Sequence, residues 1–207
     1  MKSWFKKLEL ELTRPLPGVE AQLRMAPDMR RPEPGDLPLR NGGVLILVYP
    51  HRDKLSTVLI KRTEYDGIHS GQVSFPGGMY EEEDGSLLNT ALREAREETG
   101  IEISSVRVIG PLTPLHIPVS NVIVHAFVGV THSRPKFNHD PVEVQYLIEE
   151  SIHKLLNKAN QKTKIMLIAG KEVIVPYFDM MGDHVWGATA MILSEFLEVI
   201  GRSAFKF

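Results

Sequence analysis

Short apolar runs rich in β-branched residues recur along the chain and predict the strands of a sheet. Residues 44–48 form a fully apolar run that fits a buried strand, and residues 56–61 fit its antiparallel partner. The remaining predicted strands lie over residues 106–109, 122–130 and 143–148, with an extended piece over 72–75 and a hairpin over 165–175 that turns near Gly170 and Lys171. We expect the first two of these strands to start a sheet.

In the segment before residue 100, the apolar residues instead follow the spacing of a helix. Its apolar stripe, at i, i+3, i+4 and i+7, consists of Leu88, Ala91, Leu92 and Ala95. Asp84 or Ser86 can cap the amino end of this helix, and Gly100 stands where a carboxyl-terminal stop belongs. Other helices are predicted over residues 5–12, 151–159 and 186–200.

Prolines interrupt the amino-terminal part of the chain. They stand at Pro15, Pro17, Pro27, Pro32, Pro34 and Pro38, so no long helix can form there. We therefore expect residues 1–40 to form an arm that packs on the rest of the protein. Residues 41–207 are expected to form one domain of the α/β class.

Composition and charge exclude several classes of function. The chain has 207 residues, 43% of them hydrophobic and 24% charged, which is typical of a globular protein. A formal net charge of -2 does not favour nucleic acid as a partner. The absence of cysteine excludes disulfides, thiolate metal sites and cysteine nucleophiles. No apolar run is long enough to cross a membrane, so we expect a cytoplasmic protein.

Three carboxylates share one edge of the predicted helix over residues 86–100. At about 100° per residue, Glu94 and Glu98 lie one turn apart and Glu97 lies beside them. Like charges at this spacing repel, so the cluster needs either solvent or a cation. A solvated face with an Arg93–Glu97 pair is the simpler interpretation. Oxygen-only ligands would suit Mg²⁺ or Mn²⁺.

The glycine pair Gly77-Gly78, which ends 15 residues before Arg93, favours the metal site over the solvated face. Glycines can expose backbone carbonyls and let a phosphate chain approach closely. The acidic turn over residues 81–84 would add oxygen ligands nearby.

The stretch from Gly78 to Ile101 resembles the Nudix box. Its tail, Arg-Glu-Ala-Arg-Glu-Glu-Thr-Gly-Ile from residue 93, matches that pattern at every position. In the first half, Asp84 replaces the usual Glu and Arg93 comes one residue late. The resemblance implies an α/β/α sandwich with a mixed central sheet, and metal-dependent cleavage of a diphosphate linkage.

The same resemblance assigns roles to residues of the box. The metal ligands would come from Gly77, Gly78, Glu94, Glu97 and Glu98. Glu94 would also be a candidate general base, oriented by Arg93, and Glu98 would be essential for turnover. A pyrophosphohydrolase needs such ions because they neutralise phosphate oxygens and activate water.

The late Arg93 narrows the resemblance to the coenzyme A pyrophosphatase branch. Segments 59–63 (Leu-Ile-Lys-Arg-Thr), 69–78 (His-Ser-Gly-Gln-Val-Ser-Phe-Pro-Gly-Gly) and 115–121 (Leu-His-Ile-Pro-Val-Ser-Asn) are similar to that branch. The branch implies cleavage of coenzyme A or acyl-CoA to 3',5'-ADP and 4'-phosphopantetheine. Asp66 and Gly67 stand where it usually has an apolar residue and an arginine.

Two other functions stay open at this point. One is a Nudix pyrophosphatase that acts on ADP-ribose or dinucleoside polyphosphates, which the missing arginine favours. The other is a Nudix-fold binding module without turnover. In each case the partner is a small nucleoside diphosphate derivative rather than nucleic acid or a membrane, and a homodimer is left open.

Four residues outside the box are candidates for substrate binding. Arg62 ends a strand and suits either a phosphate contact or a structural pair. His69 either meets the substrate or shapes the glycine loop, and Ser120 either binds the nucleotide or caps a turn. Glu143 precedes a strand where it could bring another acid to the site. The acids that compete for this role are Asp140, Glu149 and Glu150.

Overall fold

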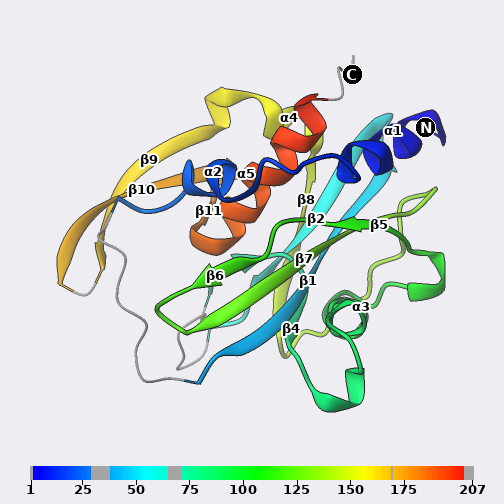
Figure 1. The fold of residues 1–207 in the computed structure, drawn as a ribbon, viewed down its shortest axis with the longest axis horizontal. Coiled ribbons are helices and arrows are strands. Elements are labelled where there is room, and N and C mark those ends of the chain that lie inside the picture. Colours follow the sequence, from blue (N-terminus) through cyan, green and yellow to red (C-terminus); the bar gives the residue numbers. More distant parts are fainter. Residues whose placement is uncertain (1, 29–37, 65–70, 169, 203–207) are drawn as a thin grey trace.

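A mixed sheet forms the centre of the protein (Figure 1). The computed structural model describes residues 2–28, 38–64, 71–168 and 170–202. The strands of this sheet are β1 (Arg40–His51), β2 (Lys54–Arg62), β3 (Val73–Ser74), β4 (Gly77–Met79), β5 (Arg107–Pro111), β6 (Leu115–Ile117), β7 (Val122–Val130) and β8 (Val144–Ser151). The order is β3-β2-β1-β7-β5, while β4 pairs with β1, β6 with β7 and β8 with β2.

Strand direction within this sheet is mixed. β1 and β7 run parallel over nine residue pairs, from Arg40 opposite Val122 to Val48 opposite Val130. The other pairs are antiparallel, including the predicted pair of β1 and β2. β1 is buried on both faces, which explains why its sequence is apolar without alternation.

A second, smaller sheet contains the predicted hairpin. Its three strands are β9 (Gln161–Ile168), β10 (Lys171–Met180) and β11 (Asp183–Trp186), in the order β11-β10-β9. The turn lies at Gly170, whose φ of 75° is in the left-handed region that glycine adopts without strain. The hairpin prediction is confirmed, and both strands extend beyond the predicted residues.

Helices cover both faces of the central sheet (Figure 1). They are α1 (Lys2–Leu12), α2 (Gly18–Leu23), α3 (Leu87–Thr99), α4 (Ile152–Leu156) and α5 (Gly187–Arg202), with 3-10 turns η1 (Glu82–Asp84), η2 (Ile103–Ser105) and η3 (Lys158–Asn160). α3 packs through Ala91 and Ala95 on Leu45 and Leu47 of β1.

The opposite face of β1 contributes Ile46 and Val48 to a larger core with α1 and α5. Because neighbouring residues of a strand point to opposite faces, one apolar run supplies both cores. This arrangement confirms the expected α/β/α sandwich with a mixed central sheet. In the part of the chain that the structure describes, no helix is both long and apolar enough to cross a membrane.

One predicted helix is shorter than expected. The helix predicted over residues 151–159 ends at Leu156, because the Asn157 side chain accepts the Ala159 N–H and starts the separate turn η3. The sequence pattern also missed four short elements: α2, β4, β6 and β11.

Candidate functional site

The helix that carries the glutamates begins and ends at local signals. The Ser86 hydroxyl accepts the N–H of Asn89 at 3.2 Å and so caps α3. Gly100, with a φ of 69°, donates its N–H to the Arg96 carbonyl at 2.8 Å and ends the helix. Of the two predicted caps, Ser86 is correct. The Asp84 carboxylate binds Arg93 instead.

The glycine pair lets three elements approach one another closely. Gly77 and Gly78 in β4 pair with Val44 and Gly43 of β1. A side chain at Gly77 would collide with the β1 backbone, and one at Gly78 would overlap the Glu94 carboxylate. Both positions therefore need glycine, and the Glu94 carboxylate lies directly over the β4 backbone.

Glu98 is the most deeply buried acid of the site, with no exposed side-chain surface. Its Oε2 accepts the Gly77 N–H at 2.8 Å. Its Oε1 accepts a hydrogen bond from Arg62 Nη2 at 2.6 Å, and the same nitrogen donates to the Gly77 carbonyl at 3.1 Å. Arg62 thus joins the end of β2 to both the glutamate helix and the glycine loop.

Burial makes the charge on Glu98 costly. Loss of hydration raises the pKa of Glu98 to about 7, although Arg62 and the Gly77 N–H favour the ionised form. The negative charges of Glu94 and Glu143 raise this pKa further. Both the protonated and the ionised form of Glu98 are therefore populated near neutral pH.

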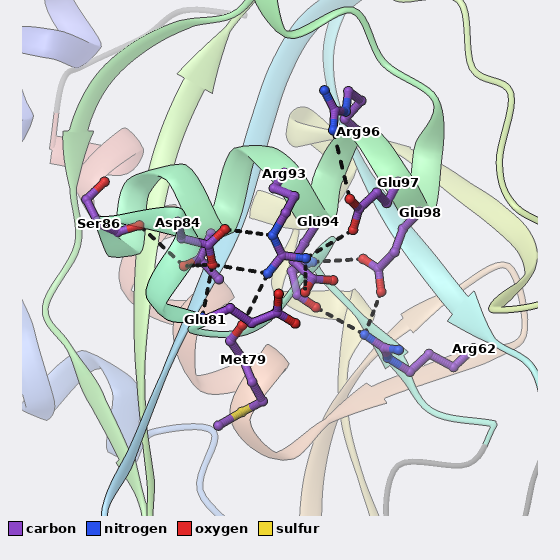
Figure 2. Close-up of polar contacts among 12 residues, drawn as sticks. Arg62, Met79, Glu81, Asp84, Ser86, Arg93, Glu94, Arg96, Glu97 and Glu98 are labelled. Carbon is purple, nitrogen blue, oxygen red and sulfur yellow. Dashed lines mark hydrogen bonds and ion pairs between the residues drawn. The ribbon is translucent and has the colours of Figure 1, made fainter.

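Arg93 gathers the other carboxylates of the helix (Figure 2). Its Nη1 donates to Glu94 at 2.9 Å and to Glu97 at 3.0 Å, while its Nε and Nη2 bind Asp84 at 2.7 and 3.1 Å. Its Nη2 also lies 3.4 Å from the Met79 carbonyl oxygen. One guanidinium therefore holds three acids and the glycine loop in place.

Asp84 is a structural partner of Arg93. Its carboxylate also accepts hydrogen bonds from the Thr90 hydroxyl and the Glu81 N–H. These contacts, led by Arg93, hold the pKa of Asp84 well below its usual range. In the acidic turn over residues 81–84, the Asp84 carboxylate is bound to Arg93, while Glu82 and Glu83 are exposed to solvent.

Glu143 lies close enough to act on both central glutamates. Burial raises the pKa of Glu94, Arg93 opposes this shift, and the charges of Glu97 and Glu143 add to it. Glu143 itself is exposed at the start of β8, where its carbonyl accepts the Thr63 N–H at 3.0 Å. The structure therefore brings Glu143 to the same end of the sheet as Glu94 and Glu98.

The acids that compete with Glu143 bind elsewhere. Their partners are the Val142 N–H for Asp140, Tyr49 and Arg134 for Glu149, and Lys154 for Glu150. Among the predicted substrate-binding residues, Ser120 is buried in the turn between β6 and β7 and is not part of the network around Arg62 and Arg93. His69 lies outside the described residues.

A cavity of about 290 Å³ adjoins the network. It lies at the start of β1 and the end of β4, and it is lined by Leu39, Arg40, Asn41, Met79 and Tyr80. Met79 is the residue that the cavity shares with the network, because its carbonyl oxygen lies 3.4 Å from Arg93 Nη2. The sequence alone did not indicate it, because neither Leu39 nor Tyr80 belongs to a motif.

The donor atoms suit a hard divalent cation. Carboxylate and carbonyl oxygens are the ligands that Mg²⁺ and Mn²⁺ prefer, and Gly78 leaves room for the Glu94 carboxylate against the β4 backbone. Within the described ranges, no three acidic or histidine side chains converge as a complete metal cage. The oxygens that would bind a cation are instead held by the guanidinium groups of Arg62 and Arg93.

A known domain family and several known proteins match this chain. The NUDIX domain model matches residues 39–167. The chain is 33% identical to Nudix hydrolase 15, mitochondrial, of Arabidopsis thaliana over 84% of this chain and 60% of that protein. It is 30% identical to the Nudix hydrolase NudL of Yersinia enterocolitica over 80% of this chain and 85% of that protein. The chain spans about 60% of the length of the plant relatives that it matches.

Solved structures share the fold at low sequence identity. A MutT protein from Methanosarcina mazei Go1 aligns with a TM-score of 0.51 and 20% identity, over 83% of this chain and 99% of that one. A MutT/nudix family protein from Enterococcus faecalis aligns with a TM-score of 0.52 and 16% identity, over 82% of this chain and 65% of that one. From the matched domain and the NudL relative, this chain belongs to the NUDIX domain family.

Proposed function

We propose that this protein is a metal-dependent pyrophosphohydrolase that cleaves a P–O–P linkage in a nucleoside diphosphate derivative. The observation that carries the proposal is the buried carboxylate of Glu98, which accepts the Gly77 N–H of the glycine loop and lies within the electrostatic influence of Glu94 and Glu143. Several acids at one partly buried edge have a high electrostatic cost, which a divalent cation would offset. Family membership supports the same reaction class.

The proposed metal ion is Mg²⁺ or Mn²⁺. Its ligands would come from the Gly77-Gly78 backbone and from Glu94, Glu97 and Glu98. When bound, such an ion neutralises phosphate oxygens and lowers the pKa of water.

Glu94 is the proposed general base. Burial raises its pKa, which makes its carboxylate a better proton acceptor than an exposed glutamate. Arg93 holds the Glu94 carboxylate at 2.9 Å, and Asp84 in turn holds Arg93. We assign Arg93 and Asp84 as positioning residues that fix the direction of this base.

Coenzyme A or an acyl-CoA is the favoured substrate, cut to 3',5'-ADP and 4'-phosphopantetheine. The support is the resemblance of segments 59–63, 69–78 and 115–121 to that branch of the family. Arg62, His69, Ser120 and Glu143 are the proposed substrate-binding residues. The second candidate is ADP-ribose or a dinucleoside polyphosphate, and the acidic Asp66 next to Gly67, where the branch has an arginine, favours it.

A substrate panel tests these alternatives. Coenzyme A, ADP-ribose and diadenosine polyphosphates are incubated with the full chain and Mg²⁺ or Mn²⁺, and the products are separated by chromatography. We expect 3',5'-ADP and 4'-phosphopantetheine to form fastest. A strong preference for ADP-ribose would overturn the coenzyme A assignment, and tight calorimetric binding without any product would indicate a binding module instead.

Glu98→Gln tests the role of the buried acid. The amide keeps the shape of the side chain but removes its charge, so we expect kcat to fall about 100-fold or more while the melting temperature is retained. Glu20→Gln, which removes the charge of an exposed side chain on α2, is the control and should keep wild-type turnover. Near-normal kcat in Glu98→Gln would contradict the assignment.

A further inference from the structure

Arg62 holds two of the atoms that the proposed metal ion would need. Its Nη2 lies 2.6 Å from Glu98 Oε1 and 3.1 Å from the Gly77 carbonyl oxygen. The other carboxylate oxygen of Glu98 already accepts the Gly77 N–H at 2.8 Å. Oε1 is therefore the oxygen through which Glu98 would meet a cation, and Arg62 is bound to it.

A guanidinium and a divalent ion compete for these oxygens. Mg²⁺ binds its oxygen ligands at about 2.0–2.1 Å, so an ion held by both Glu98 Oε1 and the Gly77 carbonyl oxygen would occupy the position that Arg62 Nη2 now fills between them. Two cations at such short range also repel each other in a partly buried site. The ion and Arg62 consequently exclude each other from Glu98 Oε1 and the Gly77 carbonyl.

The position of Arg62 allows it to move. It is the last residue of β2, its pairing with β8 is irregular between Lys61 and Arg62, and its side chain is 23% exposed. Glu98, in contrast, is fully buried in α3 and bonded to the backbone. When the pair separates, the arginine is the partner that can turn toward solvent.

A displaced Arg62 would lie beside the proposed diphosphate position. Its planar group carries five N–H donors that fit phosphate oxygens in pairs. We propose that Arg62 is an exchangeable counter-ion, which holds Glu98 and the Gly77 carbonyl before metal binding and contacts the substrate diphosphate once the ion has taken its place. This inference rests on the proposed function, and it gives Arg62 a positioning role in both states.

Metal binding measured without turnover tests the exchange. Mn²⁺ is titrated into the full chain at one fixed pH, with free Mn²⁺ followed by electron paramagnetic resonance. Because Arg62→Met removes the competitor, we expect it to bind Mn²⁺ about tenfold more tightly than the wild type. Arg107→Met, which breaks the exposed Arg107–Glu9 pair, is the control and should bind Mn²⁺ like the wild type.

A second measurement tests the other half of the exchange. Methylenediphosphonate, a diphosphate that cannot be hydrolysed at its bridge, is titrated into the Mn²⁺-loaded proteins. We expect Arg62→Met to bind it about tenfold more weakly, since one charge-assisted contact is lost. A purely structural role of Arg62 would instead weaken Mn²⁺ binding or leave both affinities unchanged, and either outcome would overturn the exchange.

Arg62→Lys keeps the inference testable if Arg62→Met does not fold. An ammonium group lacks the planar fork, so it should compete less for the two oxygens and bind the diphosphonate less well. We expect Mn²⁺ to bind about threefold more tightly than in the wild type, and unchanged or weaker binding overturns the exchange. A wild-type protein that binds no Mn²⁺ and cleaves no diphosphate contradicts the proposed function itself.

Discussion

Single glycines set the distance between the carboxylates of α3 and the backbone of β4. The Glu94 carboxylate fills the space that a side chain at Gly78 would need, so the position of this acid depends on the absence of one methyl group. Such a dependence is invisible in a residue pattern, where glycine only marks a loop. The spacing of the box could predict which acids matter, but it could not predict what each acid touches.

Gly78→Ala should damage the site more than the fold. The added methyl group displaces the Glu94 carboxylate, so we expect kcat to fall about tenfold or more, with a stability loss of about 1–3 kcal/mol from overpacking. Gly201→Ala, at a position near the end of α5 with open space around it, is the matched control and should leave kcat unchanged. Wild-type kinetics in Gly78→Ala would show that the close approach has no functional consequence.

The buried charge of Glu98 predicts how stability depends on pH. Its pKa rises from 4.5 to about 7 on folding, so the folded protein binds more protons than the unfolded chain between these values. The stabilisation is therefore complete below about pH 4.5 and is lost as the pH rises through 7. A shift of this size corresponds to a loss on the order of 3 kcal/mol.

Urea unfolding in the presence of EDTA measures this effect. From pH 5 to pH 8, the unfolding free energy of the wild type should fall relative to that of Glu98→Gln, which cannot titrate at this position. The comparison removes the contribution of acids such as Asp84, whose lowered pKa acts at more acidic pH. A constant difference between the two proteins across this range would contradict the raised pKa of Glu98.

At the scale of elements, α3 is the unit that presents the site. Its apolar stripe packs on β1, and the adjoining edge carries Glu94, Glu97 and the buried Glu98. Its amino-terminal cap is local: the Ser86 hydroxyl accepts one N–H that the helix leaves free. The acids lie two turns or more beyond this cap, so the cap contributes to stability rather than to the geometry of the site.

Ser86→Ala separates these two contributions. Loss of the cap should lower the unfolding free energy by about 1 kcal/mol, measured by urea denaturation, while kcat changes less than about twofold. Ser86→Thr keeps the hydroxyl acceptor and should restore most of this stability. A large loss of kcat in Ser86→Ala would mean that the cap also orders the carboxylate edge.

The elements that the sequence predicted are those with a strong local signal. Strand β7 occupies the predicted residues 122–130, and α3 has its stripe, cap and glycine stop in sequence. α2 escaped prediction because Pro15 and Pro17 looked like breakers, although proline is tolerated at a helix start. β4 was not predicted because glycine has a low strand propensity. This strand forms because it pairs with β1.

The network of the site could be predicted only in part for the same reason. Contacts between neighbours on the helix, such as Arg93 with Glu97, follow from spacing along one element. The contact of Arg62 with Glu98 joins β2 to α3 across 36 positions, and the influence of Glu143 comes from β8. These relations depend on how the sheet places its strands, which no single segment encodes.

At the scale of the whole molecule, the amino-terminal helices are attached to the last helix. Glu195 of α5 is fully buried, and its carboxylate accepts hydrogen bonds from the Gly18 N–H at 3.1 Å, the Thr113 N–H at 3.3 Å and Gln22 Nε2 at 2.9 Å. One acid thus joins α2, α5 and the segment after β5. A buried carboxylate with several donors stabilises an interface strongly, because each donor loses its partner when the acid is removed.

Glu195→Leu should therefore weaken the whole fold without altering the site. The leucine fills a similar volume but leaves the Gly18 and Thr113 N–H groups without their acceptor, while Gln22 Nε2 keeps only its bond to the Thr113 carbonyl. Each buried donor without a partner costs about 1–3 kcal/mol, so we expect a loss of about 3 kcal/mol or more in urea unfolding. Glu198→Leu is the matched control on the same helix. Glu198 pairs with Arg24 at the surface, and its removal should cost less than about 1 kcal/mol.

Steady-state kinetics test whether the contacts of Glu195 also affect turnover. Glu195 is bonded to no member of the network around Arg62 and Arg93, so folded Glu195→Leu should keep the wild-type KM and kcat at a temperature well below its melting point. Equal stability losses in Glu195→Leu and Glu198→Leu would show that the three donors find other partners, and that the amino-terminal helices are held by apolar packing of α1 and α5 alone.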